Sequence, residues 1–302
     1  MFYIVQTALE LGFLYALVPM ALLLSYRILD IADLATDSCF VLGAAVSVTM
    51  TAAGHPILAL PAAMAAGACA GMVTALLQTK LGVPSILAGI VTNTGLYTIN
   101  LMVMGWSSNV SLLKVETIFS MFRGTGIGGE YYEIVLAGCI VVLMGILLVL
   151  FLKTRIGLSI RATGDNIDMV RASSVNPVFS ITIGLGISNA LTALSGALVG
   201  QYQNTADING GAGIVVIGMA CLIIGETILG KRTIVKGAIA VVLGSIIYRL
   251  IYAIVLYTKV VPVHGLKLLT AIIVGLAIAF PNIKEWFFFQ KRKMAAVRKG
   301  VR

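Results

Sequence analysis

Nine apolar runs, each close to the length of a membrane-spanning helix, dominate this chain of 302 residues. A helix rises about 1.5 Å per residue, so about 20 apolar residues cross the roughly 30 Å hydrocarbon core of a bilayer. The runs are 7–27, 34–53, 57–79, 85–105, 133–152, 179–200, 213–229, 233–257 and 264–282. Backbone groups in lipid must be paired within a segment, and the alternating segments of a β-barrel are absent from the sequence. The prediction is an all-α polytopic membrane domain over 1–302 with about eight to ten transmembrane helices, of which 34–53 and 213–229 are candidates for broken or re-entrant segments.

Lysine and arginine fall mainly on one side of this arrangement. One side receives Arg27, Lys80, the cations of 153–171 and 231–236, and a basic tail, 283–302, while the other receives only Lys114, Arg123, Lys259 and Lys267. Because cytoplasmic connections carry the excess of Lys and Arg, we expect the rich side, with the C-terminus, to be cytoplasmic and the N-terminus to lie outside. The net charge of +9 then indicates affinity for anionic membrane lipid rather than for nucleic acid.

Two runs carry a small residue at every fourth position, which places these residues on one face of a helix. The first ladder is Ala59, Ala63, Gly67, Gly71 and Ala75, and the second is Gly184, Ser188, Thr192, Gly196 and Gly200. Such strips allow two backbones to approach closely. Tight packing inside the chain is the plain interpretation, and a strip facing a dimer seam or a moving pathway wall is the alternative.

Enzymatic motifs fit poorly. Segment 225–231 matches G-x-x-x-x-G-K, but Arg232 follows where a phosphate loop needs Ser or Thr for Mg²⁺, and the match ends an apolar helix. An intramembrane serine protease would need a nucleophile motif that Ala193-Leu-Ser-Gly196 lacks, and His264 stands at the edge of a span. The four cysteines are widely spaced within apolar runs, so we expect small buried side chains and not a metal site.

Polar residues inside the apolar runs are candidates for a translocation path. Arg249 falls well within 233–257, where an unpaired charge would cost at least about 2.5 kcal/mol, so we expect it to face protein or water. Tyr248 and Tyr252 flank it, and Glu226 is the partner that the sequence offers. The other candidates are Asn93, Thr94, Asn100, Ser188 and Asn189, for which hydrogen bonds between helices are an equally good explanation.

Two polar connections stand out by length. The connection 106–132 on the outer side is long enough to dock an extracellular partner or to cover the helix ends. The connection 153–177 on the basic side contains a short amphiphilic element, 161–175, in which Gly164 allows a turn and Asp165 or Asn166 can cap a helix. Its small apolar face consists of Met169, Val170 and Ala172. Such an element suits a membrane protein that receives force from a soluble motor.

A family resemblance follows from this segment. Residues 157–176 read GLSIRATGDNIDMVRASSVN and resemble the signature G-x-x-x-R-A-x-G-x-N-x-x-x-A-x-x-x-G-I-N of bacterial ABC importer permeases of the branched-chain amino acid/ribose type. The match departs at Val170, Arg171 and Ser174. Residues 30–45, DIADLATDSCFVLGAA, are similar to the family's early segment. Residues 87–105, LAGIVTNTGLYTINLMVMG, resemble the subgroup linked to tryptophan and tyrosine uptake.

The resemblance implies a permease subunit in the bacterial plasma membrane that translocates a small organic solute by alternating access. The expected solute is an amino acid, aromatic ones included. It implies two cytoplasmic ABC ATPase subunits, an extracytoplasmic substrate-binding protein and a second permease copy, arranged as a homodimer or pseudo-dimer. ATP and Mg²⁺ would be bound by the ATPase, so we expect no cofactor and no catalytic residue in this chain. The residues expected to couple to the ATPase are Arg161, Gly164, Asp165, Asn166, Met169 and Arg171.

Alternatives remain at this point. Within importers, a sugar or nucleoside is an open substrate class. A self-contained secondary transporter or channel is the main alternative from another class, and it requires a membrane-embedded acid of its own, whereas the only deep charge identified in the apolar runs is Arg249. A scaffold role is the remaining alternative.

Overall fold

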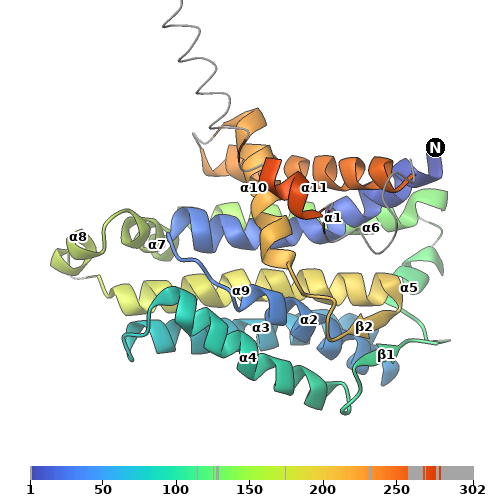
Figure 1. Ribbon diagram of the computed structural model, residues 1–302, viewed down its shortest axis with the longest axis horizontal. Coiled ribbons are helices and arrows are strands. Elements are labelled where there is room, and N and C mark those ends of the chain that lie inside the picture. The colour runs from blue at the N-terminus through green and yellow to red at the C-terminus, as the bar shows by residue number, and fades with distance from the viewer. Residues whose placement is uncertain are drawn as a thin grey trace, which may run out of the picture.

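Helices make up most of the residues that the computed structural model describes (Figure 1). The structure describes residues 2–113, 115–124, 126, 129–173, 175–230, 233–257, 268, 270–276 and 279. Within these residues, six helices are long and apolar enough to cross a membrane, and two further apolar helices are shorter. The prediction of an all-α polytopic membrane protein is therefore confirmed. Most of the predicted ninth span, including His264, and the whole basic tail lie outside the described residues.

The predicted spans agree closely with the observed helices. The long helices are α1 (Phe2–Leu22, continued by the π-helical turn η1, Leu23–Ile28), α3 (Pro56–Thr79), α4 (Ser85–Val103), α6 (Tyr132–Lys153), α9 (Pro177–Gln203) and α11 (Ile234–Tyr257). The two shorter apolar helices are α2 (Thr36–Ala52) and α10 (Ile214–Leu229). The remaining elements are β1 (Asn109–Ser111), α5 (Ile118–Gly124), η2 (Gly129–Tyr131), α7 (Arg155–Asp165), α8 (Ile167–Ala172) and β2 (Thr205–Asp207).

The two ends of the bundle are different in character. Helices α7 and α8 project at one end, which we call the α7 end, and β1, β2 and α5 lie at the opposite end, the β1 end (Figure 1). Strands β1 and β2 pair antiparallel, with Val110 opposite Ala206. Lys153, Arg155 and Arg161 all belong to the α7 end. This end therefore carries the described part of the basic side that the sequence predicts.

Helix α2 occupies only half of the bundle. After η1, the chain returns from the α7 end as the non-helical segment 29–35 and reaches the middle of the bundle, where α2 begins. The depth of this start is set by Ser38, which bonds to Asn93 in the middle of α4. Near the far end of α2, Thr49 donates to the carbonyl of Val103, the last residue of α4. Segment 29–35 is therefore re-entrant, and α2 runs from the middle to the β1 end.

Helix α10 is the counterpart of α2 and runs in the opposite direction. The loop 204–213, which contains β2, leads from the β1 end back into the bundle. Helix α10 starts beside Asp37, in the first turn of α2, and its last turns bring Glu226 to Arg27 at the α7 end. The predictions of broken or re-entrant segments at 34–53 and 213–229 both hold, because each short helix follows a non-helical re-entry.

The helices around these two half-helices show the same inverted arrangement. Helix α3 packs along α9, and α1 packs along α11, while α2 contacts α3 and α10 contacts α11. The first unit, α1–α2–α3, thus has the same order of long helix, half-helix and long helix as the second unit, α9–α10–α11, with every direction reversed. Inverted repeats of this kind, with broken helices meeting near the midplane, are a common transporter architecture.

The small-residue ladders are contact strips inside the chain. A Cβ placed on Gly67 or Gly71 would overlap backbone atoms of Asn189 or Leu185, so the first ladder lies against α9. On the second ladder, Gly196 meets the carbonyl of Phe40 in α2 with no room for a side chain. Close packing of helices, the plain interpretation, is correct for both strips.

Candidate functional site

Polar side chains gather at the start of α2, halfway along α4 and α9. This central polar cluster consists of Asp33, Asp37, Ser38, Asn93, Asn100 and Asn189, together with the first backbone N–H groups of α10. It joins the re-entrant segment 29–35, both half-helices and two long helices. Four distant parts of the chain therefore depend on one set of hydrogen bonds in the middle of the bundle.

Asp37 caps α10. One carboxylate oxygen accepts from the backbone N–H of Gly213 at 3.0 Å, and the other accepts from Val215 at 2.8 Å. The first N–H groups of a helix have no partner within it, and together they carry a partial positive charge. Lipid cannot satisfy them, so a carboxylate from α2 takes that place.

Asp33 holds the re-entrant segment against α9. Its side chain is only 3% exposed and accepts from Nδ2 of Asn189 at 2.6 Å and from the backbone N–H of Ala35 at 2.9 Å. The hydroxyl of Thr36 in turn donates to the carbonyl of Asp33. These bonds fix the turn that starts α2 and tie it to the middle of α9.

Ser38 fastens the same turn to α4. Its hydroxyl lies 2.6 Å from Oδ1 of Asn93, and its carbonyl accepts from Nδ2 of Asn100 at 3.1 Å. Three of the predicted path residues, Asn93, Asn100 and Asn189, are therefore brought together around the start of α2. Their observed contacts are hydrogen bonds between helices, which was one of the two explanations that the sequence left open.

The other predicted path residues lie elsewhere. Ser188 is buried and donates to the carbonyl of Ala21 in α1 at 2.9 Å. Thr94 is exposed on the outer face of α4 and donates to the carbonyl of Ile90 within its own helix. The structure therefore does not gather all the candidates along one channel.

Arg249 has a different environment from the one predicted. Its guanidinium lies over the ring of Tyr15, 3.7 Å from the centroid, and that ring stacks on Phe40 at 5.6 Å. Glu226, the predicted partner, is ion-paired with Arg27 at 3.1 Å. The predicted Arg249–Glu226 pairing was wrong because sequence distance does not reveal which face of α11 turns toward α1. The Tyr15–Phe40 stack borders a small cavity of about 60 Å³ toward the β1 end.

The view that Arg249 is the only deep charge was also wrong. Asp33 and Glu10 are each 3% exposed, and Tyr202 donates to Glu10 at 2.7 Å. Asp33 was overlooked because it lies at the edge of an apolar run and was treated as part of a connection. The sequence signal that could have identified Asp33 is an acidic residue at the start of an apolar run that is a candidate for re-entry.

Two of the four cysteines also differ from expectation. Cys39 and Cys221 are buried, but Cys69 and Cys139 are exposed on the surfaces of α3 and α6. Those surfaces are apolar and would face lipid or another membrane protein. Among the described residues, no group of three or more His, Cys, Asp or Glu side chains is arranged to hold a metal ion.

The polar connection 153–177 forms two helices and not one. Helix α7 begins after Thr154, whose hydroxyl accepts from the backbone N–H of Gly157, and its buried face is Gly157, Ile160 and Thr163. This face packs on α6 and α9. The expectation that Gly164 makes the turn was wrong, since Gly164 is helical and a Cβ there would overlap the carbonyl of Ile28 at the end of η1.

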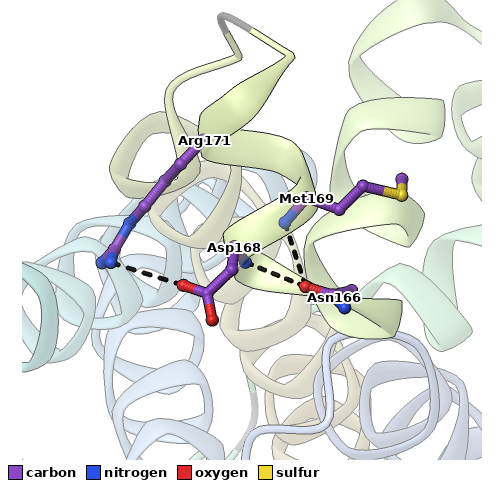
Figure 2. A network of polar contacts seen from close by, with 4 residues as sticks. All are labelled: Asn166, Asp168, Met169 and Arg171. Atoms are coloured by element: carbon purple, nitrogen blue, oxygen red, sulfur yellow. Dashed lines mark hydrogen bonds and ion pairs between the residues drawn. The ribbon is translucent and has the colours of Figure 1, made fainter.

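Asn166 makes the turn between α7 and α8 (Figure 2). Its side-chain oxygen accepts from the backbone N–H groups of Asp168 and Met169, both at 3.0 Å, which confirms the predicted helix cap. Asp168 and Arg171 pair loosely at 3.8 Å on one side of α8, and Met169, 57% exposed, extends on the other (Figure 2). Arg161 and Asp165 instead line a cavity between α7 and the ends of α1, α10 and α11.

The long connection at the β1 end partly covers the bundle. Leu112 is buried in an apolar cluster with Val48 and Ala206, and the N–H of Ile118 donates to Gln201 of α9 at 2.9 Å. Trp106 and Leu113 are 68% and 81% exposed. The cover interpretation is therefore correct for part of the connection, and docking of a partner at its exposed part stays a prediction.

Comparison with known proteins agrees with this architecture. Residues 4–280 match the family described as the branched-chain amino acid transport system / permease component. The chain belongs to this family. A tyrosine transport system permease protein from Clostridioides difficile (strain R20291) is 35% identical over 269 residues, covering 89% of this chain and 88% of the relative.

A second relative is the uncharacterized protein RP368 of Rickettsia prowazekii (strain Madrid E). It is 30% identical over 280 residues, covering 91% of this chain and 97% of the relative. No solved structure gives a significant match. The chain is thus a permease of the branched-chain amino acid transport family and a homologue of a tyrosine permease. The homologues in this permease family are transport subunits.

Proposed function

We propose that this permease is the membrane-spanning subunit of an ATP-driven importer for an amino acid, with an aromatic amino acid as the first substrate to test. The α7 end faces the cytoplasm in this proposal, so the C-terminus is cytoplasmic and the N-terminus lies outside. The observation that carries the proposal is the α7–α8 element. It combines an exposed, capped helix with a backbone contact to the re-entrant part of the bundle.

Helix α8 offers a surface for an ATPase subunit. Ile167 and Met169 are exposed apolar side chains on a short helix that the Asn166 cap holds in shape. Asp168 and Arg171 add charges of both signs around them. An apolar anchor with a charged rim is the usual composition of a specific protein interface. ATP and Mg²⁺ would bind the ATPase, and this chain would contribute no catalytic residue.

Helix α7 supplies the route from that surface to the bundle. Gly164 touches the backbone of Ile28, and segment 29–35 continues directly from there to Asp33 and the central polar cluster. A displacement of α7 toward or away from the membrane would therefore act on the re-entrant segment through a contact that leaves no free space. This contact supports an ATPase-driven change of access with the central polar cluster at its middle.

The remaining partners would take the other surfaces. A substrate-binding protein would deliver the amino acid at the β1 end, where Trp106 and Leu113 are exposed, and a second permease copy would pair through the membrane faces. Thr94, on the exposed face of α4, and Arg249, over the ring of Tyr15, remain candidates for the translocation path in this proposal.

Capture of the ATPase tests the docking surface. The permease, carrying an affinity tag, is co-expressed in turn with each candidate ABC ATPase of its own organism, and the amount of ATPase retained in detergent is measured. Met169→Glu places a charge in the apolar anchor and should reduce retention at least about tenfold, as expected for loss of a central contact. The matched control is Leu113→Glu, the same change at an exposed apolar residue of the β1 end. Equal retention by both variants would exclude α8 as the docking surface.

Uptake tests the transported substrate. Proteoliposomes that contain the permease, the ATPase and the partner binding protein are loaded with ATP, and uptake of labelled tyrosine, leucine, ribose and uridine is compared. We expect ATP-dependent uptake of an amino acid. Uptake of ribose or uridine alone would move the chain to the sugar or nucleoside alternative.

A secondary transporter is the second candidate function, because the structure contains buried acidic side chains. Asp33 and Glu10 supply the membrane-embedded carboxyl groups that such a transporter requires. Both already bond within the bundle, to Asn189 and Tyr202 respectively, which gives them a structural use. Uptake by the permease alone, driven by a proton or sodium gradient, would favour this candidate over the importer.

A further inference from the structure

A cavity of about 320 Å³ lies at the α7 end, between η1, α7, α10 and the start of α11. Its walls carry four charged side chains, Arg27, Glu226, Arg161 and Asp165. The volume is at the lower end of the roughly 300–1,000 Å³ that small-molecule sites occupy.

The four charged side chains form two sets, of which one makes an ion pair and the other does not. Arg27 and Glu226 make an ion pair at 3.1 Å, and the Glu226 side chain is only 6% exposed, so this pair belongs to the wall. Arg161 and Asp165 stand on α7 four residues apart, which places them on one face of the helix with Cβ atoms about 6 Å apart. Although an ion pair between them would be easy to form, neither takes part in any ion pair among the described residues.

An unengaged cation and anion at that spacing select for a particular ligand. A simple anion such as phosphate would be attracted by Arg161 and repelled by Asp165, and a simple amine would meet the reverse. A zwitterionic α-amino acid carries both charges on one carbon, so its carboxylate can bind the guanidinium while its ammonium group binds the carboxylate. Leu23, Ile28 and Ile234 supply the apolar part of the lining, which would contact the amino-acid side chain.

We propose that this cavity is a cytoplasmic binding site for the free zwitterionic amino acid, distinct from the translocation path. The proposal rests on the proposed function for its substrate class and for the sidedness of the α7 end. A molecule bound there joins α7 to η1 and α11, and α7 is the helix that would carry movement from the ATPase. Occupancy therefore favours one position of α7, and accumulated product slows further import.

Direct binding tests the site without requiring transport. The full-length permease is placed in nanodiscs, which leave both faces open, and binding of labelled tyrosine is measured by equilibrium dialysis. Unlabelled tyramine, which lacks the carboxylate, and 3-(4-hydroxyphenyl)propionate, which lacks the ammonium group, serve as competitors. We expect tyrosine to compete at least about tenfold better than either, because each analogue leaves one charge of the site unpaired.

Matched variants locate the site. Arg161→Gln and Asp165→Asn each remove one of the two charges in the cavity and should weaken tyrosine binding at least about tenfold. The controls are Arg171→Gln and Asp168→Asn, the same substitutions on α8 outside the cavity, which should bind as the wild-type chain does. Absence of tyrosine binding to the wild-type chain overturns the proposal, as does binding that all four variants retain, since the latter places the amino acid elsewhere.

A second measurement separates this proposal from the proposed function. In the uptake assay, tyrosine preloaded inside the proteoliposomes at its binding concentration should slow ATP hydrolysis by the wild-type complex, and Asp165→Asn should relieve that inhibition. ATP-driven uptake with no effect of internal tyrosine leaves the importer intact and refutes the product site. Specific tyrosine binding that depends on Arg161 and Asp165, found in a chain without ATP-driven uptake, supports the site and refutes the importer.

Discussion

Replacing Asp37 by asparagine tests whether a carboxylate from one half-helix holds the start of the other. The two oxygens of Asp37 accept separate backbone N–H groups, from Gly213 at 3.0 Å and from Val215 at 2.8 Å. Asparagine has the same shape but offers one acceptor oxygen and an NH₂ donor. Asp37→Asn therefore leaves one of the two N–H groups facing another donor.

The expected loss follows from the chemistry of that bond. A hydrogen bond to a charged group contributes about 1.5–3 kcal/mol, and an unpaired buried donor costs about 1–3 kcal/mol. These two values describe overlapping effects, and the Asp37 side chain is only partly buried. We therefore expect Asp37→Asn to lower the free energy of unfolding by about 1–3 kcal/mol. Asp37→Ala, which removes both bonds, should cost more than Asp37→Asn.

Denaturation by SDS in mixed micelles, followed by circular dichroism, measures these differences on the purified chain. Asp207→Asn is the matched control, because Asp207 also accepts a backbone N–H, that of Asn209 at 2.9 Å, but is exposed. Water can replace that bond, so we expect a change within about 0.5 kcal/mol. If Asp37→Asn were as mild as Asp207→Asn, the cap would not need an ionised carboxylate, and the account of the half-helix junction would be refuted.

Three further changes test other contacts. Gly164→Val forces a branched side chain against the last carbonyl of η1, at an overpacking cost of about 1–3 kcal/mol. We expect tyrosine uptake per ATP hydrolysed to fall several-fold in proteoliposomes. An unchanged ratio would contradict the route through α7. Asn189→Leu leaves the Asp33 carboxylate without the side-chain amide donor and should lower the free energy of unfolding in the SDS titration by about 3–5 kcal/mol. If the buried charge is the cause, adding Asp33→Asn to this variant should restore most of the loss. Tyr15→Leu removes the ring beneath Arg249 and should cost about 0.5–2 kcal/mol, whereas Tyr15→Phe, which keeps a ring, should cost less; equal losses would assign the effect to the hydroxyl group that both variants lack, and not to the ring.

The long helices were predictable because bilayer thickness acts on sequence directly. The apolar run 133–152 became Tyr132–Lys153, and 233–257 became Ile234–Tyr257. A helix in lipid must be apolar for a fixed length and ends where polar residues reach water, so hydrophobicity marks both its position and its boundaries. The two runs flagged as broken or re-entrant are the two half-helices, although length does not mark both of them, since 34–53 is as long as 133–152.

Contacts between helices were less predictable. Periodicity places Arg249 on a face of α11 but does not say which helix covers that face, so Glu226 was chosen for its charge and depth. Gly164 was assigned to a turn because glycine permits one, yet its use is to let α7 touch η1. The depth of Arg249 and the missing side chain of Gly164 were both interpreted correctly. The residue that each one contacts lies more than 100 residues away in the sequence, and this contact determines its role.

Asp33 and Asp37 are explained by the ends of the half-helices, and this structural use differs from a proton path. A helix that stops in the middle of a membrane leaves N–H groups that lipid cannot satisfy, and its N-terminus carries positive potential. Asp37 meets that need for α10, and Asp33 secures the turn that starts α2. At the other end of α10, where the dipole is negative, Arg27 pairs with Glu226 and adds a cation near the last turn. Helix α10 is thus held at each end by a charge from the first inverted unit, and a movement of η1 would reach it through Arg27 at one end and through the re-entrant segment and Asp37 at the other.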